Sequence, residues 1–166
     1  VSFSYESEKS LMNSKKSLIN LKKSSAWSEQ QVCSFLATST IPLRIATTTG
    51  SYPTLCSVWY MFDERQGDLL CVSHENSQLV ADLMANQKCS FEIAPNEPPY
   101  CGVRGKAMVT LSKDYALETL TTLIPRYLGN AESRLAKWLI GRSAEEYVIR
   151  LRPVQMTSWD YSERMS

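Results

Sequence analysis

The hydrophobic pattern of this chain is mostly that of β-strands. Apolar and β-branched residues alternate with polar ones over short runs that Gly, Pro and Asp bring to an end. In the run 102–111, Val103 and Ala107 share one face, and Arg104 and Lys106 share the other. The tally is about six strands in meander order. They lie within 43–49, 54–62, 68–73, 88–94, 102–111 and one closing stretch, which Pro153 interrupts between 146–152 and 154–161.

Four helices are predicted, one before the first strand and three between later strands. Ser28 and Gln31 form a capping box for a helix over 29–37. Asn76 or Ser77 can cap the next helix, whose apolar face includes Leu79. Two more helices precede the last strands: one opened by Ser112 and Asp114 that runs to Leu128, and one over 131–140. No regular alternation of strand and helix appears, so the fold class is mainly β (α+β) with antiparallel pairing.

The chain divides into two parts of different composition. Residues 1–26 are rich in Ser and Lys, which predicts a flexible N-terminal arm with a short helix around 11–22. Residues 27–166 carry the strand and helix patterns and predict one domain. No apolar run approaches the roughly 20 residues that cross a bilayer, so no membrane association is expected.

The composition limits the kinds of partner and catalytic group to be expected. A formal net charge of +1 gives no electrostatic case for nucleic acid as the partner. The five cysteines are odd in number and form no C-x-x-C pair, so we expect buried thiols in a reducing, cytoplasmic setting and no metal site. His74 is the single histidine. With one such base, catalysis is more naturally carried by a bound cofactor, and no catalytic side chain is assigned.

Four segments, in consistent order, together resemble the pyridoxamine 5′-phosphate oxidase-like split-barrel family. RIATTT matches the first core strand, and VSHENSQLVADLMANQKCSFEI matches a strand, capped helix and strand. PPYCGVRGKAMV matches a long strand with V-x-G-K/R-A, and RPVQMTSWDYSERM matches the closing strand of a subset. The resemblance implies a six-stranded antiparallel split β-barrel with flanking helices. It also implies a homodimer that holds FMN, or a deazaflavin, at the subunit interface.

The resemblance also carries cofactor contacts onto this sequence. The first strand would line the ring and phosphate, the strand ending in Val72 and Ser73 would contact the flavin, and Tyr100 would face the ring. Trp59 and Trp159 would stack beside it, or would fill the core or a dimer interface. Ser77 would bind phosphate at the helix start, or would only cap the helix. The first-strand positions are Arg44, Ile45, Ala46, Thr47, Thr48 and Thr49.

This chain departs from the family at the phosphate. The family usually has Ser-Arg-Lys at the start of the helix, where this sequence has Ser77, Gln78 and Leu79, and by its position Gln78 is an expected cofactor contact. Each lost charge-assisted bond is worth about 1.5–3 kcal/mol, so other cations must replace them if FMN is to bind tightly. Arg44 and the pair Arg104 and Lys106 are candidates, and a solvated cationic stripe is the alternative for that pair.

Three functions stay open at this point. The first is an FMN- or deazaflavin-dependent oxidoreductase with an unknown substrate. Thr49 stands where the family oxidase has its substrate-contacting lysine, which argues against pyridoxamine phosphate oxidation. The second is a non-catalytic cofactor-binding or sensing module, which Gln78 and Leu79 favour. The third is haem binding through His74, whose plainer interpretation is a solvent-exposed polar side chain.

Overall fold

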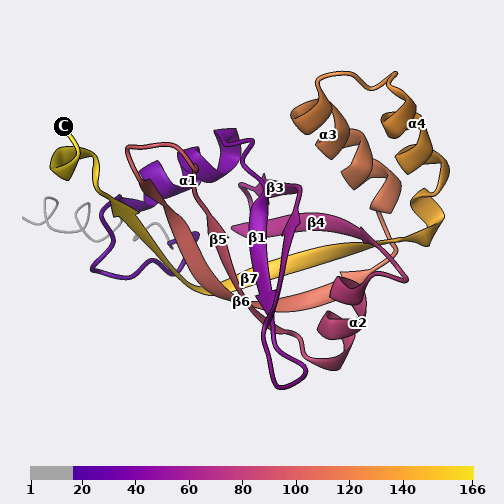
Figure 1. Ribbon diagram of the computed structural model, residues 1–166, viewed down its shortest axis with the longest axis horizontal. Coiled ribbons are helices and arrows are strands. Elements are labelled where there is room, and N and C mark those ends of the chain that lie inside the picture. The colour runs from indigo at the N-terminus through magenta and orange to yellow at the C-terminus, as the bar shows by residue number, and fades with distance from the viewer. Residues whose placement is uncertain (1–16) are drawn as a thin grey trace, which may run out of the picture.

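A single antiparallel sheet of seven strands forms the body of the molecule in a computed structural model that describes residues 17–166. The strand order is β2-β1-β5-β6-β7-β4-β3, and the sheet curls into a split barrel (Figure 1). The predicted fold class is confirmed, but the strand count of six was wrong. The strands are β1 (Leu43–Thr47), β2 (Thr54–Val58), β3 (Tyr60–Asp63), β4 (Asp68–His74), β5 (Lys88–Ile93), β6 (Cys101–Ser112) and β7 (Glu146–Asp160).

Trp59 explains the additional strand. The predicted strand 54–62 is broken at this residue, so that β2 pairs with β1 and β3 pairs with β4. β2 and β3 are therefore at opposite ends of the strand order, and β2 also contacts β4. The chain therefore turns a corner at Trp59, and this corner brings the two edges of the curled sheet together. A pattern of alternating residues cannot reveal a change of partner within one run.

The hairpin of β6 and β7 is the longest pairing in the sheet. Twelve residues of β6 are matched along β7, with one irregularity between Lys106 and Ala107. Lys106 pairs with Gln155 and Ala107 with Pro153, so one residue of β7 is left over at this bulge. Because Pro153 lies at the bulge, it does not divide β7 into the two strands that the sequence suggested.

Helices flank both ends of the barrel. α3 and α4 lie together over one end of β4 and β7, α2 lies below that end, and α1 covers the other end (Figure 1). Ser28 caps α1 through the predicted capping box, and Ser77 caps α2. The helix predicted to open at Ser112 and Asp114 begins only after Tyr115, as α3. Ser112 and Asp114 bond to each other in the turn that precedes it. The helices are α1 (Glu29–Thr38), α2 (Gln78–Ala85), α3 (Ala116–Leu128) and α4 (Arg134–Gly141).

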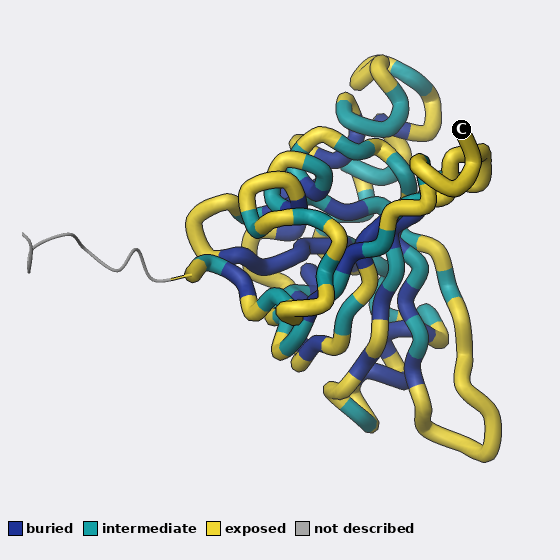
Figure 2. Tube along the Cα trace, turned by 90° about the vertical axis from the view of Figure 1, so that its left-hand side faces the viewer, coloured by how far each residue is buried: buried dark blue, intermediate teal, exposed yellow. Residues whose placement is uncertain are grey.

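The core lies inside the curled sheet, under α1 and α2. Figure 2 shows the buried strands at the centre and exposed positions on the helices and loops. Leu36, Ile45, Leu83 and Met156 are among the fully buried side chains. Within residues 17–166, none of the helices combines the length and apolar character that crossing a bilayer requires.

Residues 17–26 lie along β7. Lys22 donates its backbone N–H to the Met156 carbonyl, and Met156 donates to Asn20, each at 2.8 Å. Ile19 is buried in the core. The predicted helix around 11–22 is absent from the part that the structure describes, because these residues make a bridge with a strand instead. The rest of that prediction lies outside the described residues.

Gly105 is required by the close approach of β6 to its neighbours. A Cβ atom there would lie 2.7 Å from the Gln155 carbonyl and 2.7 Å from the Phe91 ring. We expect Gly105→Ala to lower the free energy of unfolding by about 1–3 kcal/mol in a denaturant titration. Gly50→Ala is the control, since a Cβ atom there meets nothing within 4 Å. Equal stability of the two variants would contradict the tight packing described for Gly105.

Candidate functional site

Two hollows bring together some of the residues that the sequence singled out. One, the helix-side cavity, has a volume of about 470 Å³. It lies where the ends of β2 and β4 meet the start of α2, with α3 and α4 on its other side. The second, the sheet-face cleft, has a volume of about 420 Å³ and lies on the face formed by β1, β2, β5, β6 and β7. Both volumes are in the usual range of small-molecule sites.

The helix-side cavity gathers four predicted contacts. Trp59 comes from the corner between β2 and β3, Val72 and Ser73 from β4, and Ser77 from the cap of α2. The Ser73 hydroxyl donates to the Ser77 hydroxyl at 2.9 Å. The Trp59 ring stacks on Tyr127 at 5.3 Å between centroids, which leaves at most its opposite face for a ligand. The other lining residues are Ser57, Val58, His74, Leu120, Leu123, Leu135, Leu139, Arg142 and Glu146.

Three other predicted contacts converge on the buried Asp82 instead. Gln78 donates to its carboxylate at 2.7 Å, Thr47 at 2.8 Å and Thr49 at 3.1 Å. The hydrogen bonds from Gln78 and Thr47, supported by Thr49, hold the pKa of Asp82 below its ordinary value. Thr48 is tied nearby, since its carbonyl accepts from the Asn86 amide at 2.9 Å. These polar groups therefore join α2 to β1, and line neither hollow.

The sheet-face cleft gathers the predicted cations. Arg44 and Ala46 line it from β1, and Arg104 and Lys106 line it from β6. Glu92 lies between the two arginines, 3.9 Å from Arg44 and 4.0 Å from Arg104. The cleft is lined further by Lys22, Leu55, Ser90, Phe91, Gly105, Gln155, Met156 and Thr157.

The two arginines of this cleft are already engaged. Arg44 donates to the Ala94 carbonyl at 3.0 Å and to the Asn96 side chain at 2.6 Å. The Arg104 guanidinium lies over the ring of Trp159, 4.1 Å from its centroid. Lys106 is exposed and makes no ion pair with any residue of 17–166.

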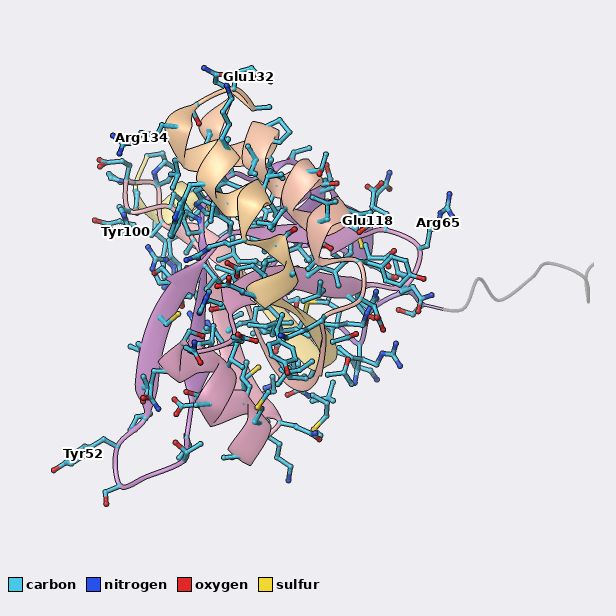
Figure 3. All side chains as sticks on the ribbon, turned by 90° about the vertical axis from the view of Figure 1, so that its right-hand side faces the viewer. Tyr52, Arg65, Tyr100, Glu118, Glu132 and Arg134 are labelled. Atoms are coloured by element: carbon cyan, nitrogen blue, oxygen red, sulfur yellow. The ribbon has the colours of Figure 1, made fainter. Side chains whose placement is uncertain are left out.

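The remaining predicted contacts lie apart from both hollows. Ile45 points into the core, where it is almost fully buried. Tyr100 is 48% exposed and projects from the surface (Figure 3). Trp159 is half-buried and lies beneath Arg104. Alternation along a strand does not say which face meets a hollow, and this is why the first strand divides between core and cleft.

His74 and the cysteines offer no evident catalytic group. His74 accepts from the Asn76 backbone N–H through Nδ1 at 3.1 Å, and its Nε2 lies 2.9 Å from Glu145. Both ring nitrogens are therefore engaged, which speaks against haem ligation. All five cysteines are free, and burial raises the pKa of Cys71 and brings that of Cys89 to about 12. These two thiols are neutral at physiological pH and are poor nucleophiles.

Sequence reasoning did not single out Arg142 and Glu146. Arg142 follows α4 and Glu146 begins β7, and both side chains line the helix-side cavity. Arg142 Nε lies 2.7 Å from Glu146 Oε1, although the pair is not aligned as a hydrogen bond. The spacing i, i+4 was the available signal, but it occurs outside any predicted helix and is common on protein surfaces.

Comparison with known proteins identifies the fold. No protein-family model and no curated protein matches the chain. A conserved hypothetical protein from Mycobacterium tuberculosis superposes with a TM-score of 0.71 at 16% identity, covering 89% of this chain and 93% of its own. An F420 reductase superposes with a TM-score of 0.61 at 18% identity, covering 74% of this chain and 93% of its own. A third structure, from Listeria innocua, is described as a candidate pyridoxamine 5′-phosphate oxidase. It superposes with a TM-score of 0.58 at 13% identity, covering 80% of this chain and 97% of its own.

These similarities establish the architecture. The chain has the split-barrel fold of the pyridoxamine 5′-phosphate oxidase-like proteins, as the sequence resemblance predicted. Identities below one fifth show the fold alone, and a fold hosts many functions. The activity has therefore to be argued from the residues of this chain.

The Asp82 cluster predicts a pH dependence of stability. Because the folded pKa of Asp82 lies below its ordinary value of 3.8, the unfolded chain takes up this proton at a higher pH than the folded chain. The stabilisation is present above pH 3.8 and is lost as the pH falls through the lowered pKa. We expect Asp82→Asn to be less stable than the wild type at pH 7, with the difference narrowing in acid.

Urea titrations between pH 7 and pH 3 measure this effect. Asp114→Asn is the matched control, because Asp114 is exposed and bonds only within its own turn. If the stability difference between wild type and Asp82→Asn stays constant with pH, Asp82 does not titrate as described.

Proposed function

We propose that this protein is a flavin-type oxidoreductase, using FMN or the deazaflavin F420, that binds the cofactor in the helix-side cavity. The observation that carries the proposal is the convergence of Trp59, Val72, Ser73 and Ser77 on one hollow. These residues come from three separate segments of the chain. The F420 reductase among the structures of the same fold supports this class of cofactor.

The residues of the cavity fit such a cofactor. Leu120, Leu123 and Leu139 supply an apolar wall for a planar ring, and Ser73 and Ser77 supply hydroxyl groups on the opposite side. The start of α2 adds backbone N–H groups and the positive end of a helix dipole, which favour an anionic group. A bound flavin supplies hydride transfer, and the protein contributes position and electrostatics.

The dimer proposed with this function uses the sheet-face cleft. Leu55 is 75% exposed on β2 and lies among the cationic residues of that face. Leu55 belongs to a hollow that is also lined by Ala46 and Met156, and an apolar surface rimmed by polar groups is typical of an interaction site. We propose that a second copy covers this face, and that Arg44, Arg104 or Lys106 thereby approaches the cofactor from the partner side.

A sensing module that binds the cofactor weakly and catalyses nothing is the second candidate. The observation that favours it is the loss of cations at the start of α2, where Gln78 is bonded to Asp82 and Leu79 is buried. Turnover separates the candidates. Cofactor binding without any reduction of the bound flavin by NADH, NADPH or reduced F420 would favour the sensor.

Filling the cavity tests its assignment. Ser73→Phe places a ring beside the start of α2, and we expect it to weaken binding of FMN or F420 by at least about tenfold, since the site loses volume. Isothermal titration calorimetry measures the affinity, and an absorbance band at about 450 nm reports flavin bound in the purified protein. Ser51→Phe, in an exposed loop, is the control. Wild-type protein that binds neither cofactor would refute the proposal, and a sharp band at about 400 nm would indicate haem instead.

Charge on the proposed interface tests the dimer. We expect the wild type to have the mass of a dimer in size-exclusion chromatography with light scattering. Leu55→Arg should shift it toward monomer, because it removes an apolar contact and adds a cation to a cationic face. Tyr52→Arg at the nearby loop tip (Figure 3) should leave the mass unchanged. A monomeric wild type would contradict the dimer.

A further inference from the structure

One arginine of the helix-side cavity is held in a fixed orientation. Among the described residues that line the cavity, Arg142 is the permanent cation. Its guanidinium lies over the ring of Trp138, 3.8 Å from the centroid. Its Nε edge is 2.7 Å from a carboxylate oxygen of Glu146, which is only 2% exposed. The face and the inner edge of the guanidinium are thus both occupied.

The two terminal nitrogens of Arg142 are not committed in this way. Neither makes a hydrogen bond within residues 17–166, whereas Arg44 donates to Ala94 and Asn96. Because Trp138 and Glu146 already restrict the side chain, little rotamer entropy remains to be lost when a ligand binds. A guanidinium with two free, adjacent donors matches the oxygens of a phosphate group.

A second set of donors lies at the start of α2, where Ser77 lines the same hollow. Ser77 caps α2 by accepting from the Val80 N–H at 3.2 Å, and this leaves the N–H groups of Gln78 and Leu79 without a partner in the described part of the chain. The Ser73 hydroxyl lies beside the cap. Free N–H groups at a helix start bind anions, but they supply no full charge by themselves.

The obvious alternative is that Arg142 and Glu146 form a purely structural clamp between α4 and β7. A clamp explains the contact with Glu146, but leaves both terminal nitrogens of a cavity-lining arginine unused. The pair is nearly neutral overall, so its attraction for an anion depends on short hydrogen bonds more than on long-range charge. The gain in phosphate affinity that we expect from Arg142 is therefore that of a few charge-assisted hydrogen bonds.

We propose that Arg142 and the start of α2 together bind the phosphoryl group of the cofactor, in place of the cations that Gln78 and Leu79 do not supply. This inference rests on the proposed cofactor cavity. Arg142 lines that cavity from the connection after α4, and its partner Glu146 is paired in the sheet with His74, just before the start of α2. The ligand class is a phosphate ester attached to a planar, largely apolar ring.

Comparison of FMN with riboflavin isolates the phosphate. The two ligands share the ring and differ in the phosphoryl group, so the ratio of their affinities reports on the phosphate site alone. We expect wild-type protein to bind FMN about 10- to 100-fold more tightly than riboflavin. Arg142→Gln should reduce this ratio to about 3 or less, with riboflavin affinity unchanged. Quenching of flavin fluorescence in a titration measures both.

Arg134→Gln is the matched control, because it makes the same substitution on α4 at an exposed side chain that points away from the body of the molecule (Figure 3). The ratio of FMN affinity to riboflavin affinity in Arg134→Gln should equal that of the wild type. Since Arg142→Gln leaves Glu146 buried without its partner, the neutral double variant Arg142→Gln/Glu146→Gln is tested beside it. An unchanged ratio in either folded variant would overturn the assignment of Arg142.

Inorganic phosphate separates this inference from the proposed function. If wild-type protein binds neither flavin nor F420, the cofactor proposal fails, yet the anion site is still measurable. Phosphate should then raise the melting temperature of the wild type above that in sodium chloride of equal ionic strength, and should not do so for the double variant. Equal shifts in both proteins would refute the anion site independently of any cofactor.

Discussion

Antiparallel pairing of β6 with β7 is the constraint on which the rest of the molecule depends. These two strands are central in the sheet, and every other strand is placed, directly or through a neighbour, by pairing with one of them. On one side β5 pairs with β6 and β1 pairs with β5. On the other side β4 pairs with β7 and β3 pairs with β4. The alternation along β6 puts Val103 in the core and Arg104 in the sheet-face cleft. One register therefore fixes both the core and the cationic face.

A second constraint concerns the start of α2. In this chain the helix is attached to β1 through Asp82, which accepts hydrogen bonds from Thr47, Thr49 and Gln78. A cation at position 78 that reached for a phosphate would leave that carboxylate with fewer donors. The polar residues that the resemblance associates with the cofactor are thus used to hold α2 in place. The cavity beside the helix keeps the hydroxyl groups of Ser73 and Ser77, and its permanent cation is Arg142, which is paired with Glu146.

Much of this fold could be predicted from local patterns. Capping by Ser28 and Ser77, the long strand β6 and the split-barrel class all followed from periodicity, caps and the resemblance of four segments. The corner at Trp59 could not, because a strand that changes partner has the same alternation as one that does not. Pro153 was misread for a related reason, since only the register reveals the bulge that accommodates it.

The candidate site was less accessible to such reasoning. The sequence placed Arg44 and Ser73 in one site, whereas they line different hollows. Both are polar residues on strands, and the curl of the sheet decides which hollow each one meets. Arg142 was missed because its partners, Trp138 and Glu146, belong to a helix and a strand that local patterns treat separately. These three residues lie within nine positions of one another, but only the tertiary fold shows that Arg142 and Glu146 line a cavity.

The position of α3 and α4 within the chain has a consequence for how such proteins diversify. Both helices are inserted between β6 and β7, which pair along twelve residues, and α3 is bonded to the body of the molecule through Arg126 and Tyr127. The roof of the helix-side cavity is therefore an insertion in a hairpin that is already specified by its own register. Changes of length or sequence in the exposed parts of that insertion can reshape the cavity while the register of β6 with β7 is kept, so the shape of the hollow and the pairing of the barrel can evolve separately.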